Sequence, residues 1–240
     1  MLILKNVNTV INWKKIIQNI NLTLNKGEIL ALLGHNWSGK TTLIKTIMWL
    51  LPSEWKIIFN WKEINNLETF KRAKLGLGYI MQEVPEYIWI TVFLYVKNIL
   101  DLEWKFNENQ VKYYFDMFWL NWETYKDRNF WSWLSWWEKK KIEIITSFLL
   151  DKDIYLLDEI ETSLDVTSRQ VLIEFIKDLQ KKWKSFILVS HNQDMLWLAQ
   201  RWVLLCNWFI HWQWEVKNLL KLYLKKCEVC NWSDYLNCNT

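Results

Sequence analysis

The segment EILALLGHNWSGKTTLIKTIM, residues 28–48, decides the fold of this chain. Residues 28–33 form an apolar run that predicts a buried strand, and the apolar spacing after residue 40 predicts a helix over 40–50. Between them, Gly34–Thr41 satisfies the pattern G-x-x-x-x-G-K-[ST]. In a strand-loop-helix context this pattern is typical of a phosphate-binding loop.

The chemistry of such a loop assigns roles to its residues. Backbone N–H groups and the helix N-terminus surround the β-phosphate of a nucleotide, while Lys40 reaches the β and γ oxygens. The Thr41 hydroxyl is predicted to coordinate Mg²⁺, so the expected ligands are ATP and Mg²⁺. The predicted nucleotide-binding residues are Gly34, Asn36, Ser38, Gly39, Lys40, Thr41 and Thr42.

Two adjacent carboxylates end the apolar stretch DIYLLDE, residues 153–159. In phosphate-loop proteins such a pair supplies Asp158 to Mg²⁺ and lets Glu159 orient or deprotonate the attacking water. The later strand FILVS, residues 186–190, leads into His191, which is positioned to touch the γ-phosphate. The sequence therefore predicts a nucleotide-hydrolysing centre.

Strand and helix patterns alternate along the chain, which predicts an α/β fold with a mainly parallel sheet. From Gln82 to the strand at 153 the pattern is wholly helical, so a helical subdomain over about 84–150 is expected to be inserted in the sheet core. An antiparallel β portion is expected at the N-terminus. The expected strands are 2–7, 16–24, 28–33, 56–59, 78–82, 153–158, 185–190 and 202–206, and the expected helices are 40–50, 91–102, 108–119, 136–150, 167–182 and 215–226.

The composition limits the class of protein. A formal charge of +4 over 240 residues, with basic and acidic residues intermixed, gives no indication of a nucleic-acid partner. No apolar run approaches the ~20 residues that span a bilayer, so a cytoplasmic location is expected, with a peripheral position at the inner membrane face as the alternative for a transporter subunit.

Glycine and tryptophan are both abnormal in number. The chain has 5 glycines and 20 tryptophans, although about 17 glycines would be usual at this length. Six tryptophans follow asparagine: Trp13, Trp37, Trp61, Trp122, Trp208 and Trp232. Asn-Gly is a strong turn signal and Asn-Trp is not, and KIIFNWKEI, residues 56–64, reads as a hairpin only if Trp61 is glycine.

We therefore hypothesise that most or all tryptophan positions are UGA codons that the source genome reads as glycine. Abundant Lys, Asn and Ile are typical of an AT-rich genome, in which such reassignment occurs. The alternative is a tryptophan-rich contact surface, but the positions follow turn logic and not helical or strand periodicity. Trp89, Trp104 and Trp119 lie in apolar helical surroundings and fit the hypothesis least well.

The pentapeptide LSWWE, residues 134–138, differs only at its tryptophans from the LSGGE signature of the ABC ATPase superfamily. Together with the phosphate loop and the carboxylate pair, it makes the chain resemble the nucleotide-binding subunit of that superfamily over about residues 1–225. The resemblance implies a phosphate-loop NTPase core with ATP hydrolysis as its activity. It also implies that Gln82 is the Q-loop glutamine near Mg²⁺, that Asp165 belongs to the D-loop, and that His191 is the switch histidine.

The same resemblance implies a head-to-tail homodimer that closes on ATP. Ser135, Trp136, Trp137 and Glu138 would then act on the ATP of the other subunit, through N–H groups at a helix start. An indole at Trp136 or Trp137 would occupy nucleotide space, so the literal chain is expected to hydrolyse ATP very slowly. As written, it could be a non-enzymatic nucleotide-binding module.

Two branches of the superfamily remain open. The stretches EKKKIEI, LDEIETSLDV and YIMQEVPEYIWITVFLYV resemble the ATPase subunit of the SUF iron–sulfur cluster assembly system, although Glu161, Thr162 and Ser163 depart from its Asp-Ser-Gly. That branch implies soluble cluster-scaffold partners, whereas a transporter branch implies membrane subunits. Transporter subunits often stack adenine on an aromatic near residue 12, where a genuine Trp13 could serve.

The C-terminal tail, residues 226–240, contains Cys227, Cys230 and Cys238. A C-x-x-C pair with a third thiol could bind zinc or an iron–sulfur cluster with one further ligand from His211 or a partner. A disordered tail with incidental thiols is the alternative.

Overall fold

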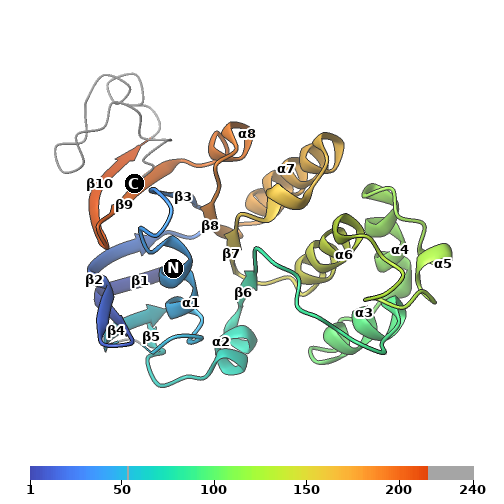
Figure 1. Ribbon diagram of the computed structural model, residues 1–240, viewed down its shortest axis with the longest axis horizontal. Helices are drawn as coiled ribbons and strands as arrows, with labels where there is room; N and C mark the ends of the chain where they lie inside the picture. Colours follow the sequence, from blue (N-terminus) through green and yellow to red (C-terminus); the bar gives the residue numbers. More distant parts are fainter. Residues whose placement is uncertain (53, 216–240) are drawn as a thin grey trace.

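A six-stranded sheet lies at the centre of the computed structural model, which describes residues 1–52 and 54–215 (Figure 1). All neighbouring pairs in this sheet are parallel except β10 with β9. Its strands, in spatial order, are β10 (Phe209–Glu215), β9 (Arg201–Cys206), β3 (Ile29–Leu33), β8 (Ser185–Val189), β7 (Ile154–Asp158) and β6 (Leu77–Ile80).

The central strands are buried on both faces, as parallel strands covered by helices must be. Every residue of β3, β7 and β8 is buried. Because the sheet is parallel, the loops after β3, β6, β7 and β8 all leave from the same edge. That edge is where the sequence placed the phosphate loop, Gln82, the carboxylate pair and His191.

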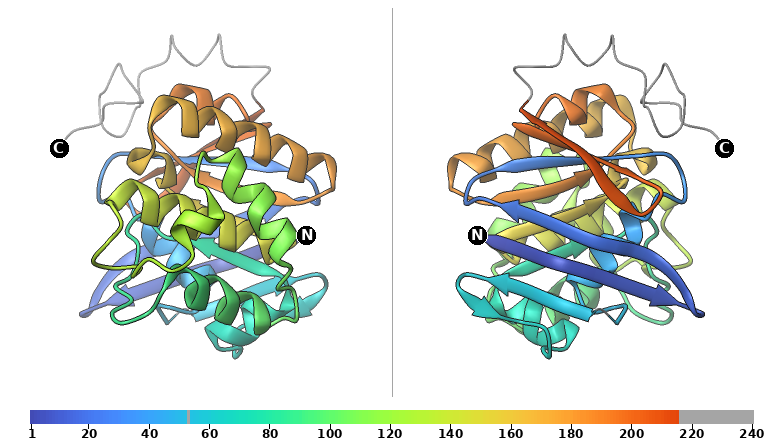
Figure 2. Two further views of the ribbon diagram at one scale, coloured as in Figure 1. Left: turned by 90° about the vertical axis from the view of Figure 1, so that its right-hand side faces the viewer. Right: turned by 90° about the vertical axis from the view of Figure 1, so that its left-hand side faces the viewer.

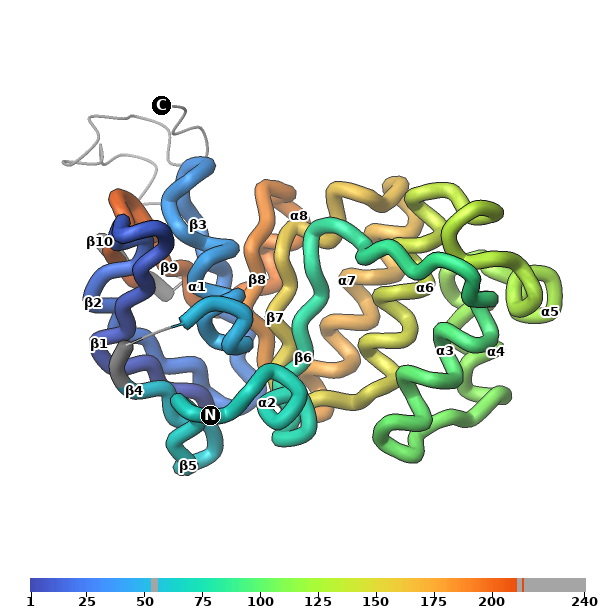
Figure 3. Tube along the Cα trace, turned by 60° about the horizontal axis from the view of Figure 1, so that its bottom comes forward, coloured from blue at the N-terminus to red at the C-terminus, as the bar shows by residue number. Residues whose placement is uncertain are grey.

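A second, antiparallel sheet lies beside the first, in the order β2 (Lys14–Leu24), β1 (Leu2–Ile11), β4 (Glu54–Phe59) and β5 (Lys62–Glu63). Helix α1 (Lys40–Ile47) runs between the two sheets (Figure 3). Its buried Leu43, Ile44 and Ile47 belong to one apolar cluster with strands of both sheets. The phosphate-loop helix is therefore fixed by packing on two sides.

The other face of the central sheet is covered by helices. Figure 2 shows them on one side of the molecule, with the antiparallel sheet on the other. They form a second apolar cluster that includes Phe115, Phe148 and Phe175. The helices are α3 (Val92–Asp101), α4 (Glu108–Met117), α5 (Trp122–Tyr125), α6 (Trp136–Leu149) and α7 (Val166–Lys181).

The predicted α/β class, the mainly parallel sheet, the N-terminal antiparallel portion and the helical insertion between β6 and β7 are confirmed. The expected strands and helices did not include β10, α2 (Thr69–Leu75), α5, α8 (Gln193–Leu196) or the 3₁₀ segment Ile160–Ser163, whereas β5 is the returning strand of the hairpin expected over 56–64. The strand expected over 78–82 ends at Ile80, so Gln82 lies in a loop. The helix expected over 215–226 is wrong at Glu215, which ends β10, and its remainder lies outside the described residues.

Two further predictions concern the periphery of the chain. The tail with Cys227, Cys230 and Cys238 lies outside the described residues, so its metal or cluster site stays a prediction. Within residues 1–52 and 54–215, no helix combines the length and the apolar character needed to cross a membrane.

Candidate functional site

The phosphate loop connects β3 to α1 and is shaped by two glycines with positive φ. Gly34 has φ +151° and Gly39, which caps α1, has φ +103°. A Cβ atom at Gly34 would lie 2.2 Å from the carbonyl oxygen of Leu205. Glycine is therefore required at 34 by space and at 39 by backbone conformation.

The Lys40 side chain donates hydrogen bonds to backbone carbonyl groups of its own loop. Its Nζ donates to the carbonyl oxygens of Gly34 at 2.7 Å and His35 at 3.0 Å. The side chain is only 6% exposed, and burial lowers the pKa of Lys40, while Glu159 and Asp158 act in the opposite direction. The ammonium group is thus held beside the loop whose N–H groups would surround a phosphate.

Asp158, at the end of β7, lies next to Thr41. The Thr41 hydroxyl donates to Asp158 Oδ1 at 3.1 Å, and the Tyr79 hydroxyl donates to Oδ2 at 3.3 Å. Burial raises the pKa of Asp158, although the bond from Thr41 opposes this rise. A hydroxyl and a carboxylate side by side form the all-oxygen donor set that Mg²⁺ prefers, so these residues fit the predicted ion.

Glu159 is held from two sides by loops of other strands. Gln82 Nε2 donates to Glu159 Oε2 at 3.0 Å, and His191 Nε2 lies 3.3 Å from Oε1. The bond with His191 lowers the pKa of Glu159, against the effect of burial. Glu159 also has a left-handed backbone, with φ 50° and ψ 36°, a conformation that non-glycine residues adopt at a cost, often at functional sites.

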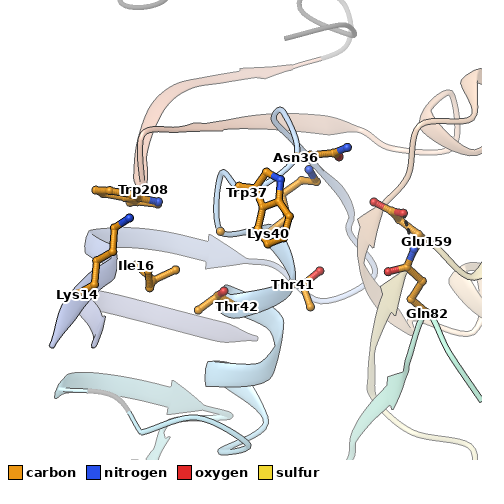
Figure 4. Close-up of a pocket in the computed structure, with 11 residues that line it drawn as sticks. Lys14, Ile16, Asn36, Trp37, Lys40, Thr41, Thr42, Gln82, Glu159 and Trp208 are labelled. Atoms are coloured by element: carbon orange, nitrogen blue, oxygen red, sulfur yellow. Dashed lines mark hydrogen bonds between the residues drawn. The ribbon is translucent and has the colours of Figure 1, made fainter. Parts of the chain in front are cut away.

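Of the residues described above, Lys40, Thr41, Gln82 and Glu159 border a cleft of about 590 Å³. Figure 4 shows Glu159 and Gln82 at one end and Lys14 with Trp208 at the other. Trp13, the predicted base-stacking residue, is 99% exposed and does not line the cleft. The lining residues are Lys14, Ile16, Asn36, Trp37, Gly39, Lys40, Thr41, Thr42, Gln82, Glu159 and Trp208.

A second cavity of about 600 Å³ shares Thr41 and Gln82 with the first. Tyr79 and Asp158 line it from the sheet, and Trp136 lines it from α6. The Trp136 indole N–H also donates to Ser163 Oγ at 2.8 Å. An indole at this position therefore lies against the loop that follows the carboxylate pair of its own chain.

The signature residues form the N-terminus of α6. Ser135 caps the helix, and its side chain and that of Glu138 make a reciprocal capping box. Ser135, Trp136 and Trp137 are exposed, and none of them lines the phosphate-loop cleft. The chain therefore brings together the phosphate loop, Gln82, Asp158, Glu159 and His191, whereas the signature approaches them only through Trp136, which lines the second cavity with Thr41.

Two other predicted residues, Asp165 and Ser38, differ in their hydrogen bonding. Asp165 caps α7, accepting from the Ser168 backbone N–H at 2.8 Å and from the Ser168 hydroxyl at 2.7 Å. Burial acts to raise the pKa of Asp165, but these bonds and Lys141 outweigh it and hold the pKa at about 2. Ser38 Oγ is buried and has no hydrogen-bond partner among the described residues.

Sequence reasoning missed Tyr79 as a partner of Asp158 and Glu161 as a partner of Ser190. Tyr79 reaches Asp158 because β6 and β7 pair in parallel, with Ile80 opposite Leu157. Glu161 was noted only as a departure from a family pattern. The signal available in the sequence was a further carboxylate next to apolar Ile160, two residues after Glu159.

Within residues 1–52 and 54–215, nine tryptophans have a left-handed backbone, with φ between 56° and 72°. Three of them follow an asparagine of positive φ, at Asn12-Trp13, Asn60-Trp61 and Asn207-Trp208, where the chain turns between paired strands. Two consecutive residues of positive φ define the type I′ hairpin turn that favours Asn-Gly. The other six are Trp37, Trp49, Trp89, Trp104, Trp119 and Trp183.

Four of these tryptophans directly follow helical segments. After α1, the Trp49 N–H donates to the Thr46 carbonyl and the Leu50 N–H to that of Lys45, at 3.0 and 2.9 Å. The same paired pattern occurs at Trp104, Trp119 and Trp183. This is the Schellman motif, whose left-handed position is usually glycine.

Trp122 and Trp202 differ from these nine. Trp122 is 1% exposed, its ring lies 4.9 Å from that of Phe115, and its indole N–H donates to Glu108 at 3.0 Å. Trp202 is 9% exposed and donates to the Leu196 carbonyl at 3.2 Å. Both side chains are packed and hydrogen-bonded as genuine core tryptophans would be.

A phosphate loop, an acidic strand end and a carboxylate held by glutamine and histidine define a nucleotide-hydrolysing protein of the phosphate-loop class. The family model described as "ABC transporter" matches residues 17–162. The chain belongs to this family, and it is an ATP-binding ATPase of the ABC type.

Individual relatives agree with this assignment. An uncharacterised ABC transporter ATP-binding protein of Methanocaldococcus jannaschii is 27% identical over 224 residues, covering 90% of each chain. The energy-coupling factor transporter ATP-binding protein EcfA2 of Clostridium tetani is 33% identical over 200 residues, covering 78% of this chain and 68% of its own. A dimeric ATP-binding cassette bound to ADP and Pi has the same fold, with a TM-score of 0.78 at 20% identity, covering 90% of this chain and 99% of its own.

Proposed function

We propose that this protein is the ATP-hydrolysing subunit of a membrane ABC transporter. The observation that carries the proposal is the position of Glu159, which is held by Gln82 and His191 at one end of the cleft that Lys40 also lines. The transporter names of the relatives support the choice of partner. The subunit would work in the cytoplasm, against the inner face of the membrane.

In this mechanism, Glu159 orients the attacking water and accepts its proton. Its lowered pKa keeps the carboxylate ionised and ready to accept a hydrogen bond from water. His191, which lies next to the other carboxylate oxygen of Glu159 from Gln82, would contact the γ-phosphate. Lys40 must leave the carbonyl oxygens of Gly34 and His35 to reach the phosphates.

The residues that would hold Mg²⁺ are Thr41, Asp158 and Gln82. When bound, the ion neutralises charge that develops on the phosphate oxygens. Thr41 and Asp158 are already in contact, and both line the second cavity together with Gln82. Movement of Gln82 from Glu159 to the ion would couple nucleotide binding to the helical insertion that follows the Q-loop.

Completion of the site requires a second copy of the chain. We propose that Ser135 and the α6 N-terminus contact the ATP held by the other subunit, because they are exposed and do not line their own phosphate-loop cleft. The D-loop residue Asp165 would lie at the same interface. The dimer of the related cassette supports this arrangement.

The SUF reading is less well supported than the transporter reading. It depends on three sequence stretches, whereas both relatives described above are named as transporter proteins. The test is purification from native cells under mild conditions, followed by analysis of ATPase activity. Co-purification with membrane subunits would support the transporter proposal, and a stable complex with a soluble scaffold protein would overturn that proposal.

We also propose that most tryptophan positions are glycine in the native polypeptide. A left-handed backbone costs a non-glycine residue about 1–2 kcal/mol. Nine of the described tryptophans adopt it, seven of them at hairpin turns or helix ends where glycine is usual. The exposure of Trp13, Trp61, Trp89 and Trp104, 83% to 99%, means that no packing offsets this cost. Trp122 and Trp202 are the positions where genuine tryptophan fits.

The test of this proposal is mass spectrometry of the protein from its native host. Trypsin should release NFWSWLSWWEK, residues 129–139, because Arg128 and Lys139 flank its cleavage sites. A peptide whose fragment masses show glycine at 131, 133, 136 and 137 supports the proposal. Fragment masses of tryptophan at all four positions would overturn it.

A further inference from the structure

Glu161 is a buried carboxylate outside the predicted ATPase machinery. It lies in the 3₁₀ segment Ile160–Ser163, two residues after Glu159, and is 2% exposed. Charged side chains are almost never fully buried unless they are paired. The contacts of Glu161 therefore indicate why the chain keeps an acid at this position.

One oxygen of Glu161 holds the residue that precedes the switch histidine. The Ser190 hydroxyl donates to Glu161 Oε1, and the same Ser190 oxygen accepts from the Asn192 backbone N–H at 3.0 Å. Ser190 is itself 2% exposed. Residues on both sides of His191 are thus fixed through one serine, which is fixed in turn by Glu161.

The other oxygen, Oε2, is buried and has no hydrogen-bond partner among the described residues. Nε of Arg169, on α7, is also buried and has no hydrogen-bond partner among the described residues. Burial raises the pKa of Glu161, and the bond from Ser190 and the charge of Arg169 act against this rise. An incompletely bonded buried acid contributes little stability, so packing alone does not account for it.

The two loops joined by Glu161 carry the two groups that meet at the reaction centre. Glu159 begins the first loop, and His191 begins the second, with Nε2 and Oε1 3.3 Å apart. The Glu159 backbone N–H also donates to the Val189 carbonyl at 2.9 Å. The Glu161–Ser190 contact adds a side-chain link between the two loops at the residue that precedes His191.

We propose that Glu161 is a positioning residue for the switch histidine, acting through Ser190. The inference rests on the proposed roles of Glu159 and His191 in ATP hydrolysis. Displacement of a reacting group by about 1 Å can cost about 10²-fold in rate. Loss of the Glu161–Ser190 contact should therefore reduce turnover while leaving the nucleotide-binding surface of the phosphate loop intact.

The test compares steady-state hydrolysis and ATP binding in variants of the full chain. At the tryptophan positions these variants carry glycine or tryptophan, whichever mass spectrometry finds in the protein from its native host. Ser190→Ala and Glu161→Ala should each lower kcat about tenfold, with the ATP dissociation constant changed less than about twofold. Glu161→Gln keeps an oxygen that accepts from Ser190 and should retain most of the activity.

Ser185→Ala is the matched control. Ser185 is a buried serine at the other end of β8, whose hydroxyl donates to the Asn25 carbonyl at 3.0 Å and accepts from the Gly27 N–H at 2.9 Å. Its loss should lower the melting temperature without a specific loss of kcat. An equal loss of kcat in Ser185→Ala and Ser190→Ala would overturn the proposal.

A second comparison separates positioning from general damage. In a His191→Ala background, Glu161→Ala should cause no further loss of kcat, because the group that it positions is gone. The same tenfold loss in that background would show that Glu161 acts independently and would contradict the inference. Failure of the proposed function itself would be distinguishable, since Glu159→Gln would then leave hydrolysis unchanged.

Discussion

Two parts of the molecule would contribute to the proposed site through different chemical groups. They are the phosphate-loop half, residues 34–42 with Asp158 and Glu159, and the signature half, residues 134–138. In the phosphate-loop half, Lys40, Thr41, Asp158 and Glu159 lie at one edge of the parallel sheet and contact one another or their own loops. In the signature half, the proposed functional groups are backbone N–H groups at the start of α6. Under this proposal the first half depends on side-chain identity, and the second depends on the absence of side-chain bulk.

This difference explains why tryptophan has unequal consequences in the two halves. Trp37 lies in the phosphate loop but is 92% exposed, so the loop keeps its shape around Lys40. Trp136 and Trp137 are 39% and 48% exposed at the N-terminus that a partner's nucleotide would have to approach. Under the proposed two-subunit site, an indole in place of hydrogen would be tolerated in the phosphate loop and would block the signature.

Lys40→Ala should give the largest effect and would remove the phosphate-loop half alone. Loss of a preorganised charge at a transferring phosphate costs about 10²–10³-fold in kcat, and ATP affinity should also fall. Steady-state hydrolysis and equilibrium nucleotide binding measure both quantities. Unchanged hydrolysis in Lys40→Ala would show that this cleft is not the reaction site.

Glu159→Gln should separate chemistry from binding within the phosphate-loop half. The amide keeps the shape of the side chain but cannot accept the proton of the water, so kcat should fall by about 10²-fold or more. ATP binding should remain intact, and size-exclusion chromatography with ATP should show a trapped dimer. A variant that hydrolyses ATP normally would remove Glu159 from its proposed role.

The double variant Trp136→Gly/Trp137→Gly tests the signature half in a recombinant protein that otherwise has the sequence as written. It should raise kcat about tenfold or more, because it frees the backbone N–H donors at the start of α6. Trp104→Gly is the matched control. Trp104 is 95% exposed with φ 57°, and it follows α3, away from both cavities. Equal gains in the two variants would mean that the signature indoles are no special obstacle.

Tyr79→Phe should have the smallest effect, because it removes one neutral donor to Asp158 while Thr41 remains. A hydrogen bond of about 1 kcal/mol corresponds to about a fivefold increase in the Mg²⁺ concentration needed for half-maximal hydrolysis. In the control Tyr155→Phe, the lost hydroxyl bonds only to the backbone of Lys152 and Phe148. A shift of equal size in Tyr155→Phe would contradict the role of Tyr79.

Local sequence was sufficient to predict the parts of the site that lie within one strand-loop-helix unit. Lys40 and Thr41 follow from the phosphate-loop pattern, and Asp158 and Glu159 follow from an apolar strand that ends in carboxylates. The sheet placed Gln82 and His191 beside Glu159 as the order of the motifs implied. These predictions needed only short-range patterns and the fact that parallel strands end at one edge.

Contacts between distant strands could not be predicted in the same way. The bond from Tyr79 to Asp158 depends on the register of β6 against β7, and that from Ser190 to Glu161 depends on the neighbouring ends of β7 and β8. Strand β10 was not among the expected strands, and its residues Trp212 and Trp214 are placed by their register against β9. The core positions of Trp122 and Trp202 likewise emerged only from tertiary packing.

The most direct test of the two-half site is complementation between two inactive chains. One chain carries Lys40→Ala and the other Ser135→Arg, both with glycine at positions 136 and 137. Each alone should be inactive, because every site in its homodimer lacks one half. If the halves come from different subunits, mixing should restore roughly a quarter of full activity, since half of the dimers are mixed and each has one intact site. No recovery from mixed dimers that do form would contradict the account.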